Sequence, residues 1–359
     1  MVGLKLENVS KRVLGGNGVE KLNLSVGEGE LFVIAGPPGS GKSMVLRLIA
    51  GLETPDEGEI YLGDERITDL PPHRRGISMV FQSLALYPNK TVFENIAFPL
   101  RVQKVANGEI RRRVKEVAEF LKIDHILHKY PRFLSGGEQQ RVAVARAMIL
   151  SPKLFLFDQP LANLDAIIRV AMRDEIRRIV KETGITTVYV THENVEALSI
   201  GDRIAYIEKG KIIEVGTPQD LLGSPRDFRV ARYFSDVNYL ESRVEHVNGK
   251  SYAHILTEKV LIPAGKEAGG KVILAFKLSD VILGRGFKLG GGGEMLLGRG
   301  EVTMIEEHIR SRICSVKLSE DVEVRAYTEE HFDLGERVDV MVRRDRLNVY
   351  DGDTMVRLA

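Results

Sequence analysis

The first part of the chain contains three short segments in which apolar and polar residues alternate. They are residues 3–9, residues 21–26 and Gly58–Leu62. A period of two residues is typical of a strand that buries one face. We therefore expect these segments to form a small antiparallel sheet.

A second set of short segments is largely apolar throughout. Its members are Leu31–Ile34, Ser78–Phe81, Leu154–Phe157, Thr187–Val190 and Ile204–Ile207. Helical patterns separate them, which points to a parallel sheet with both faces covered. The expected fold class is therefore α/β, and ligands of such sheets bind at the carboxyl ends of the strands.

The segment from Phe93 to about Leu150 has no strand pattern. Within it, Glu109–Leu121 and Glu138–Leu150 have the apolar period of helices. We therefore expect a helical subdomain at about residues 90–150, inserted in a first domain that spans residues 1–235.

The pattern changes after about Asp236. Short alternating segments follow, separated by glycine-rich turns such as Gly269-Gly270 and Gly290–Gly293. The segments are Glu241–Val247, Lys271–Phe276, Gly300–His308, Ser311–Lys317, Val322–Tyr327 and Arg337–Val342. Regularly spaced short strands favour a small barrel or sandwich, so we predict an all-β second domain at residues 236–359.

Composition limits the classes of function. The 359 residues suggest two to three domains, and a formal net charge of +1 gives no reason to expect a nucleic-acid partner. The single cysteine, Cys314, allows no internal disulfide and suggests a reducing compartment. No segment is long and apolar enough to span a bilayer, and we identify no signal peptide. Any role at a membrane is therefore expected to be peripheral.

The strongest chemical signal lies directly after Leu31–Ile34. The loop Gly36-Pro37-Pro38-Gly39-Ser40-Gly41-Lys42-Ser43-Met44 has the Gly-x-x-x-x-Gly-Lys-Ser spacing of a phosphate-binding loop. Its glycines let backbone N–H groups converge on anionic oxygens at a helix N-terminus. Lys42 suits β- and γ-phosphates, and the Ser43 hydroxyl suits Mg²⁺. The alternative, a glycine-rich turn without a ligand, fits poorly with the strand before it and the helix after it.

Three polar residues follow the ends of apolar segments. They are Gln82, Asp158 and His192, which we expect at the ligand-binding edge of the sheet. An acid in the position of Asp158 can hold Mg²⁺ or its water together with Ser43. Taken alone, Asp158 also fits an ordinary strand end.

A second anion site is indicated at Leu134–Arg141, which reads Leu-Ser-Gly-Gly-Glu-Gln-Gln-Arg. Ser135 fits a helix N-cap. Its hydroxyl, the glycine N–H groups and the helix N-terminus also fit an anion. Because the phosphate loop already holds one nucleotide, this site suggests a γ-phosphate presented by another subunit. A capped helix start is the alternative.

Together these motifs resemble the ATP-binding-cassette (ABC) family. The phosphate loop, Gln82, the Leu-Ser-Gly-Gly signature, Asp158, Asn163-Leu-Asp165 and His192 occur in the family's order and at its spacings. Phe81–Pro88 and Thr191–Ala197 look most like importer ATPases for maltose and related sugars. The resemblance is close over roughly residues 3–235 and looser beyond.

The resemblance implies a homodimer that sandwiches two ATP molecules head to tail. Residues 36–44 of one copy would bind the phosphates. The signature residues of the other copy would close on the γ-phosphate; they are Ser135, Gly136, Gly137 and Glu138. Asp165 would lie at the dimer seam. Gln82 would sense Mg²⁺ and the attacking water, and His192 would contact the γ-phosphate.

The resemblance also implies partners beyond the second copy. Leu84, Leu86, Tyr87 and Phe93 would form part of a cleft for a transmembrane permease subunit, and the alternative is plain core of the helical insertion. The C-terminal domain would be a regulatory barrel of the oligonucleotide-binding type, which pairs subunits and can receive a regulatory protein. The protein would work at the cytoplasmic face of the cell membrane.

Gln159 stands where the family has its catalytic glutamate. An amide cannot accept a proton, although it keeps the shape and still forms hydrogen bonds. General-base assistance is worth about 10² to 10⁴ in rate, so we expect slow hydrolysis with ATP binding retained. One interpretation is an importer ATPase with slowed turnover, and another is a nucleotide-gated clamp. A third, a soluble cassette protein acting on ribosomes or DNA, predicts paired cassettes or long insertions that this sequence does not have.

Four smaller departures accompany Gln159. Val13 replaces the family's adenine-stacking aromatic residue, Met44 a threonine, Glu138 the glutamine of the signature, and Ala162 a serine. Loss of stacking is expected to weaken ATP binding by about 1 kcal/mol and to relax base selectivity. The charge of Glu138 suits a helix N-terminus better than it suits phosphate.

Overall fold

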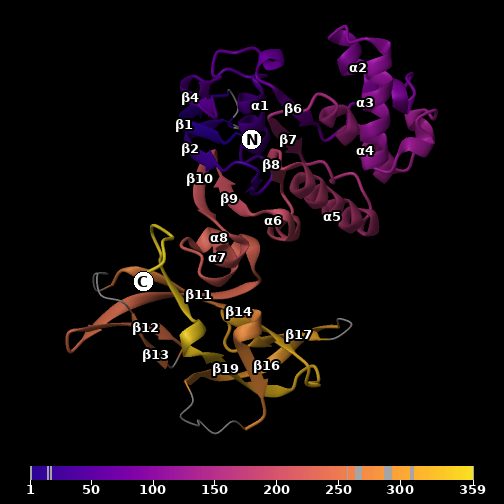
Figure 1. The fold of residues 1–359 in the computed structure, drawn as a ribbon. Helices are drawn as coiled ribbons and strands as arrows, with labels where there is room; N and C mark the ends of the chain where they lie inside the picture. The colour runs from indigo at the N-terminus through magenta and orange to yellow at the C-terminus, as the bar shows by residue number, and fades with distance from the viewer. Residues whose placement is uncertain are drawn as a thin grey trace. The chain divides into compact units, whose positions relative to one another are not determined.

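The computed structural model describes residues 2–13, 16, 18–256, 258–262, 269–286, 293–307 and 311–358. It divides into two compact units, Met1–Gln219 and Asp220–Ala359 (Figure 1). The division falls earlier in the chain than residue 235, because α8 (Phe228–Phe234) packs on strands of the second unit. The boundary between residues 235 and 236 stays a prediction for the folding domains.

The first unit begins with an antiparallel sheet in the order β2-β1-β4-β5. Its strands are β1 (Leu4–Lys11), β2 (Val19–Val26), β4 (Glu57–Leu62) and β5 (Glu65–Arg66). The inward side chains, such as Leu6, Leu22 and Ile60, are buried. The antiparallel sheet expected from the alternating pattern is confirmed.

A six-stranded sheet forms the centre of this unit, in the order β10-β9-β3-β8-β7-β6. Its strands are β3 (Leu31–Ala35), β6 (Ile77–Val80), β7 (Leu154–Asp158), β8 (Thr186–Thr191), β9 (Arg203–Glu208) and β10 (Lys211–Gly216). The strands from β9 to β6 run parallel, as predicted. β10 pairs antiparallel with β9 and is an edge strand that the sequence analysis did not predict.

Helices lie in the connections between the parallel strands. α1 (Lys42–Ala50) buries Val45, Leu46 and Ile49 in one apolar core with strands of both sheets. α5 (Ala166–Thr183) precedes β8, and α6 (Asn194–Ile200) lies against β3 and β8. The α/β class is therefore confirmed, and the apolar segments are strands because they are covered on both sides.

The inserted segment is helical. It contains α2 (Val92–Val102), α3 (Asn107–Phe120) and α4 (Gly136–Met148), which lie together in Figure 1. Short 3₁₀ turns at Asp124–Ile126 and Pro131–Phe133 connect α3 to α4. α2 was not predicted, because Pro99 interrupts its helical pattern. A capping box between Thr91 and Glu94 nevertheless marks its start.

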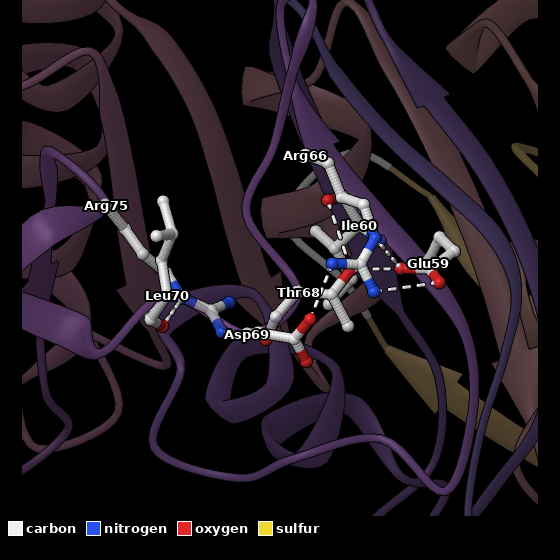
Figure 2. A network of polar contacts seen from close by, with 7 residues as sticks. All are labelled: Glu59, Ile60, Arg66, Thr68, Asp69, Leu70 and Arg75. Atoms are coloured by element: carbon white, nitrogen blue, oxygen red, sulfur yellow. Dashed lines mark hydrogen bonds and ion pairs between the residues drawn. The ribbon is translucent and has the colours of Figure 1, made fainter.

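Arg75 anchors the end of α1, after a 3₁₀ turn at Pro72–Arg74. Its Nη1 donates to the carbonyls of Leu48 and Ile49 at 2.8 and 2.9 Å, and its Nε donates to Leu70 at 2.8 Å. Carbonyls at a helix C-terminus lack partners within the helix, and Arg75, which is 3% exposed, supplies them. Arg66 joins Glu59 to Asp69 in the same region (Figure 2). The helix that follows the phosphate loop is thus fixed at its far end.

The second unit consists mainly of two five-stranded antiparallel sheets that share one apolar core. One has the order β13-β12-β11-β14-β20, with β11 (Val237–Val247), β12 (Lys250–Ile255), β13 (Glu258–Ile262), β14 (Lys271–Lys277) and β20 (Asn348–Asp351). The other has the order β15-β19-β16-β17-β18, with β15 (Val281–Gly284), β16 (Glu294–Glu307), β17 (Arg312–Lys317), β18 (Glu323–Thr328) and β19 (Arg337–Arg343).

The predicted all-β second domain is therefore confirmed as a fold class, and a short helix, α7 (Pro218–Gly223), lies at the division between the units. 3₁₀ turns occur at Leu278–Asp280 and Arg344–Arg346. The predicted strands correspond to β11, β14, β16, β17, β18 and β19. His308 and most of the predicted turn Gly290–Gly293 lie outside the described residues, apart from Gly293.

Candidate functional site

The phosphate-binding loop connects β3 to α1, as its pattern predicts. A Cβ atom on Gly36 would lie 2.1 Å from the Ile207 carbonyl oxygen, so only glycine fits there. Gly41 precedes α1 with a φ of 97°, which is a left-handed conformation that glycine adopts freely. The loop therefore owes its path to glycines at both ends, and it leads directly into the N-terminus of α1.

Lys42 is folded back over this loop. Its Nζ donates to the carbonyls of Gly36 and Pro37, both at 2.7 Å, and to the Ser40 hydroxyl at 3.1 Å. The residue is 4% exposed, and burial lowers the pKa of its ammonium group to about 8, with Asp158 acting in the opposite direction. A buried cation with little compensating charge attracts an anion.

Ser43 and Asp158 join the loop to the end of β7. The Ser43 hydroxyl donates to Asp158 Oδ1 at 3.0 Å. Burial raises the pKa of the Asp158 carboxyl, while the Ser43 hydrogen bond and the charges of Lys42 and Arg47 lower it. A hydroxyl and a carboxylate in contact form an all-oxygen donor set, which hard divalent cations prefer.

Gln159 and His192 meet across neighbouring strand ends. Nδ1 of His192 lies 2.8 Å from Oε1 of Gln159. An amide oxygen only accepts hydrogen bonds, so Nδ1 of the imidazole carries the proton. Gln159 has a φ of 47°, and its N–H donates to Val190 at 3.0 Å. The hydrogen bond continues the pairing of β7 with β8, and the left-handed conformation of Gln159 ends it.

These groups surround one cavity of about 460 Å³. It is lined by Pro38, Gly39, Ser40, Gly41, Lys42, Ser43, Met44, Arg47, Gln159 and His192. The structure thus brings the predicted loop together with the strand-end residue His192 and with Gln159, while Asp158 contacts the loop through Ser43. Arg47 is a lining residue that the sequence analysis missed. Its position four residues after Ser43, on the same face of α1, was the available signal.

Gln82 does not line this cavity. It is exposed just beyond β6, and its carbonyl accepts from Nδ2 of Asn163 at 3.3 Å. The chain then turns through Leu84 and Ala85, whose φ values are 57° and 48°. Arg146 of α4 donates to both of their carbonyls, at 2.7 and 2.6 Å. The loop after Gln82 is therefore tied to the helix that begins at the signature.

The predicted cleft residues differ in burial. Leu84, Leu86 and Phe93 are half-buried, whereas Tyr87 is exposed and its ring lies 4.6 Å from that of Phe98. Both the cleft and the core interpretation fit such a mixture, so a role in docking stays a prediction.

The signature residues form a separate group. The backbone N–H and the hydroxyl of Ser135 donate to Glu138 Oε2 at 2.7 and 2.9 Å, and the Glu138 N–H donates back to the hydroxyl at 3.3 Å. This is a capping box at the start of α4. Gly136 packs so closely on Leu164 that a Cβ atom would lie 2.7 Å from its Cδ2. Asp165 caps α5 through the Ile168 N–H at 2.9 Å.

The capped helix start predicted as an alternative for Ser135 is thus present. The same face still offers an exposed serine hydroxyl beside Gly136 and Gly137, so the anion-site role stays a prediction. Glu138 carries a full negative charge there, because its hydrogen bonds with Ser135 lower its pKa.

Val13 lies at a second cavity of about 460 Å³ in the first unit. The residue is 40% exposed, and cationic side chains share the lining, namely Lys11, Arg12, Lys21 and Lys209. Gly18 also lines this cavity. Its carbonyl oxygen would lie 3.1 Å from a Cβ atom placed on Gly41 of the loop. This cavity therefore adjoins the phosphate-binding loop.

Among the helices in the described ranges, none has the length and apolarity needed to cross a membrane.

Comparison with known proteins identifies a matching family and similar relatives. A family model described as "ABC transporter" matches residues 19–162. The trehalose/maltose import ATP-binding protein MalK of Thermococcus litoralis is 37% identical, with 99% of both chains covered. The molybdate/tungstate import ATP-binding protein WtpC of Pyrococcus horikoshii is 43% identical, with 78% of this chain and 79% of the relative covered.

A solved structure is also similar. The dimeric ATP-binding cassette MJ0796, in a post-hydrolysis state bound to ADP and phosphate, is 34% identical with a TM-score of 0.53. The match covers 60% of this chain and 98% of the cassette.

Proposed function

This chain belongs to the ABC transporter family of ATPases, and from that premise we propose that it is the ATP-driven subunit of a sugar importer whose hydrolysis is slow. The observation that carries the proposal is the cavity in which the phosphate loop, Lys42, Gln159 and His192 meet. The same proposal assigns a role to each group around it.

The phosphate loop is proposed to bind the triphosphate of ATP. Its backbone N–H groups and the N-terminus of α1 favour anionic oxygens, and Lys42 supplies a cation that burial leaves poorly compensated. Phosphate oxygens would replace the carbonyls of Gly36 and Pro37 as partners of the ammonium group. The residues assigned to the phosphates are Gly36 to Met44.

Mg²⁺ fits the oxygen pair of Ser43 and Asp158, which are already in contact at 3.0 Å. When bound, Mg²⁺ neutralises charge that develops on the phosphates. Asp158 would remain ionised beside it, because a cation opposes the effect of burial on the carboxyl pKa. Gln82 is proposed as a further ligand, because it follows β6, the strand that pairs with β7.

A second copy of the chain is proposed to complete the site. The exposed Ser135 hydroxyl and the N–H groups of Gly136 and Gly137 would close on the γ-phosphate held by the partner, with Asp165 at the seam. The dimer of the MJ0796 cassette, bound to ADP and phosphate, supports this arrangement. Glu138 stands beside the proposed contact and would weaken it by charge repulsion.

Gln159 is proposed to occupy the water-orienting position, with His192 beside it. Its amide can hold the attacking water by a hydrogen bond but cannot take its proton. Hydrolysis is therefore expected to be slower by about 10² to 10⁴ than with a general base in that position. The second candidate is a nucleotide-gated clamp. Glutamine at residue 159 favours this function as well, because slow hydrolysis would keep the ATP-bound dimer closed for longer.

The membrane and regulatory roles follow the same premise. We assign permease subunits as the partners that dock near Leu84, Leu86, Tyr87 and Phe93, and the cytoplasmic face of the membrane as the working location. The all-β second unit would pair the two copies and could receive a regulatory protein. Sugar is favoured as the cargo because the trehalose/maltose relative matches through both units, whereas the match to the molybdate/tungstate relative covers less of the chain.

Uptake in the source organism tests this function. A strain without the gene should lose accumulation of labelled maltose, trehalose or glucose, and the intact gene should restore it, whereas Lys42→Ala should not. Uptake of molybdate by the same strains tests the alternative cargo. Loss of molybdate uptake alone would replace the proposed cargo, and unchanged uptake of all these compounds together with ATP-dependent dimerisation would favour the clamp.

A further inference from the structure

A buried carboxyl group contacts the end of the strand that leads to His192. Glu196 of α6 is 7% exposed. It accepts hydrogen bonds from the hydroxyl of Tyr189 and, at 2.6 Å, from the hydroxyl of Thr191. Burial raises the pKa of this carboxyl, and the two hydrogen bonds oppose that effect. The charge of Glu193 raises this pKa further, and the charge of Arg169 lowers it.

A carboxyl group in this place costs stability unless its hydrogen bonds compensate for burial. An apolar side chain would fill the same volume without that cost. Packing alone therefore does not account for Glu196. Its hydrogen bonds hold the end of β8, through Tyr189 and Thr191.

Thr191 connects Glu196 to the turn that carries His192. It is the last residue of β8 and is 2% exposed. Its hydroxyl donates to Glu196 and accepts from the Glu193 N–H at 3.0 Å. One hydroxyl therefore ties the residue before His192 to the residue after it, and both to α6. A hydroxyl has one proton and two lone pairs, so these two bonds fix its orientation.

The ring of His192 has a separate support. Its Nδ1 lies 2.8 Å from Gln159 Oε1, and Gln159 is itself held by the Val190 carbonyl. The backbone of His192 is thus fixed from α6 and its ring from the end of β7. Neither Thr191 nor Glu196 lines the cavity of the phosphate loop.

We propose that Thr191 and Glu196 are positioning residues that hold His192 in place for the reaction at the phosphate loop. This inference rests on the proposed ATPase function. A misplacement of about 1 Å near reacting groups can cost about 10² in rate. Loosening this turn should therefore slow hydrolysis while ATP affinity stays unchanged, because the two residues touch no part of the nucleotide cavity.

Single-turnover hydrolysis and ATP binding by the full chain test this inference. Thr191→Val removes the hydroxyl at nearly constant size, and Thr191→Ser retains it. Thr187→Val is the matched control, because Thr187 is buried on the same strand and its hydroxyl donates to the Ile185 carbonyl at 2.9 Å, its one side-chain hydrogen bond within the described part of the chain. We expect Thr191→Val to lower the rate by about tenfold to a hundredfold with ATP affinity retained. Thr191→Ser should recover most of the rate, and Thr187→Val should leave it unchanged.

Measuring Thr191→Val in the His192→Ala background distinguishes a positioning role from a general effect on stability. The loss caused by Thr191→Val should disappear there, since no imidazole remains to be positioned. An equal loss with and without His192 would overturn the inference. Imidazole ¹⁵N resonances of His192 give a readout without ATP, and they should change in Thr191→Val but not in Thr187→Val. Unchanged resonances would overturn the inference, whereas an inactive wild-type protein with changed resonances would contradict only the proposed function.

Discussion

Replacing Gln159 with glutamate should accelerate ATP hydrolysis. The contact with His192 Nδ1 at 2.8 Å can form with either side chain, because both present an acceptor oxygen of the same reach. The left-handed backbone at Gln159 is equally accessible to both residues. The change therefore adds a proton acceptor and a charge while the geometry is retained, and the expected gain is about 10² to 10⁴ in rate, or roughly 3 to 5 kcal/mol.

Phosphate release under saturating Mg-ATP measures this gain. Gln159→Asn should stay as slow as the wild-type protein, because it keeps the amide. Lys42→Ala in the Gln159→Glu background should return the rate to baseline, which ties the activity to this cavity. Gln103→Glu makes the same change in charge at the exposed end of α2 and should have no effect. A Gln159→Glu rate equal to that of the wild-type protein would refute the reasoning, because residue 159 would then not limit turnover.

Three further outcomes follow from the site. Glu138→Gln keeps a capping-box residue but removes a negative charge beside the γ-phosphate. If the screened repulsion is about 1 kcal/mol, the dissociation constant of the ATP-bound dimer should fall about fivefold. Sedimentation measures this constant, and an unchanged value would contradict the prediction. The pKa of Lys42 is lowered in the folded protein, so the unfolded chain binds more protons than the folded one between about pH 8 and 10.5. The free energy of unfolding of the wild-type protein should therefore rise relative to that of Lys42→Met as pH rises through that window, by at most about 1.4 kcal/mol per pH unit. Denaturant unfolding at several pH values measures this difference. A constant difference would disprove the assigned pKa. Val13→Tyr should tighten ATP binding about fivefold through stacking, as titration calorimetry can show, and no change would place adenine elsewhere.

Most of the fold could be predicted because its signals are local. The buried strands of the central sheet read as apolar segments since both faces are covered, and the glycine spacing of residues 36–43 specifies a loop path that other residues cannot follow. α2 was harder to place because Pro99 interrupts its helical pattern. The edge strand β10 likewise lacked a distinct pattern, since its side chains are only partly buried.

The candidate site shows the limit of such reasoning more clearly. The residues at strand ends were predictable because position along the chain determines which edge of the sheet they reach. The support behind them was not, because Thr191 and Glu196 are buried polar residues in positions where the pattern predicts only packing. The place of Arg47 in the cavity depends on helix geometry that becomes specific only when the boundaries of α1 are known.

The central claim is that each ATP is held between the phosphate loop of one copy and the signature of another. Complementation between two inactive variants tests it most directly, with phosphate release measured in the Gln159→Glu background. Lys42→Ala and Ser135→Arg should each be inactive alone. In an equal mixture, half of the dimers are mixed and each has one intact site of two, so the account predicts recovery of about one quarter of the activity. A mixture no more active than either variant alone would contradict it.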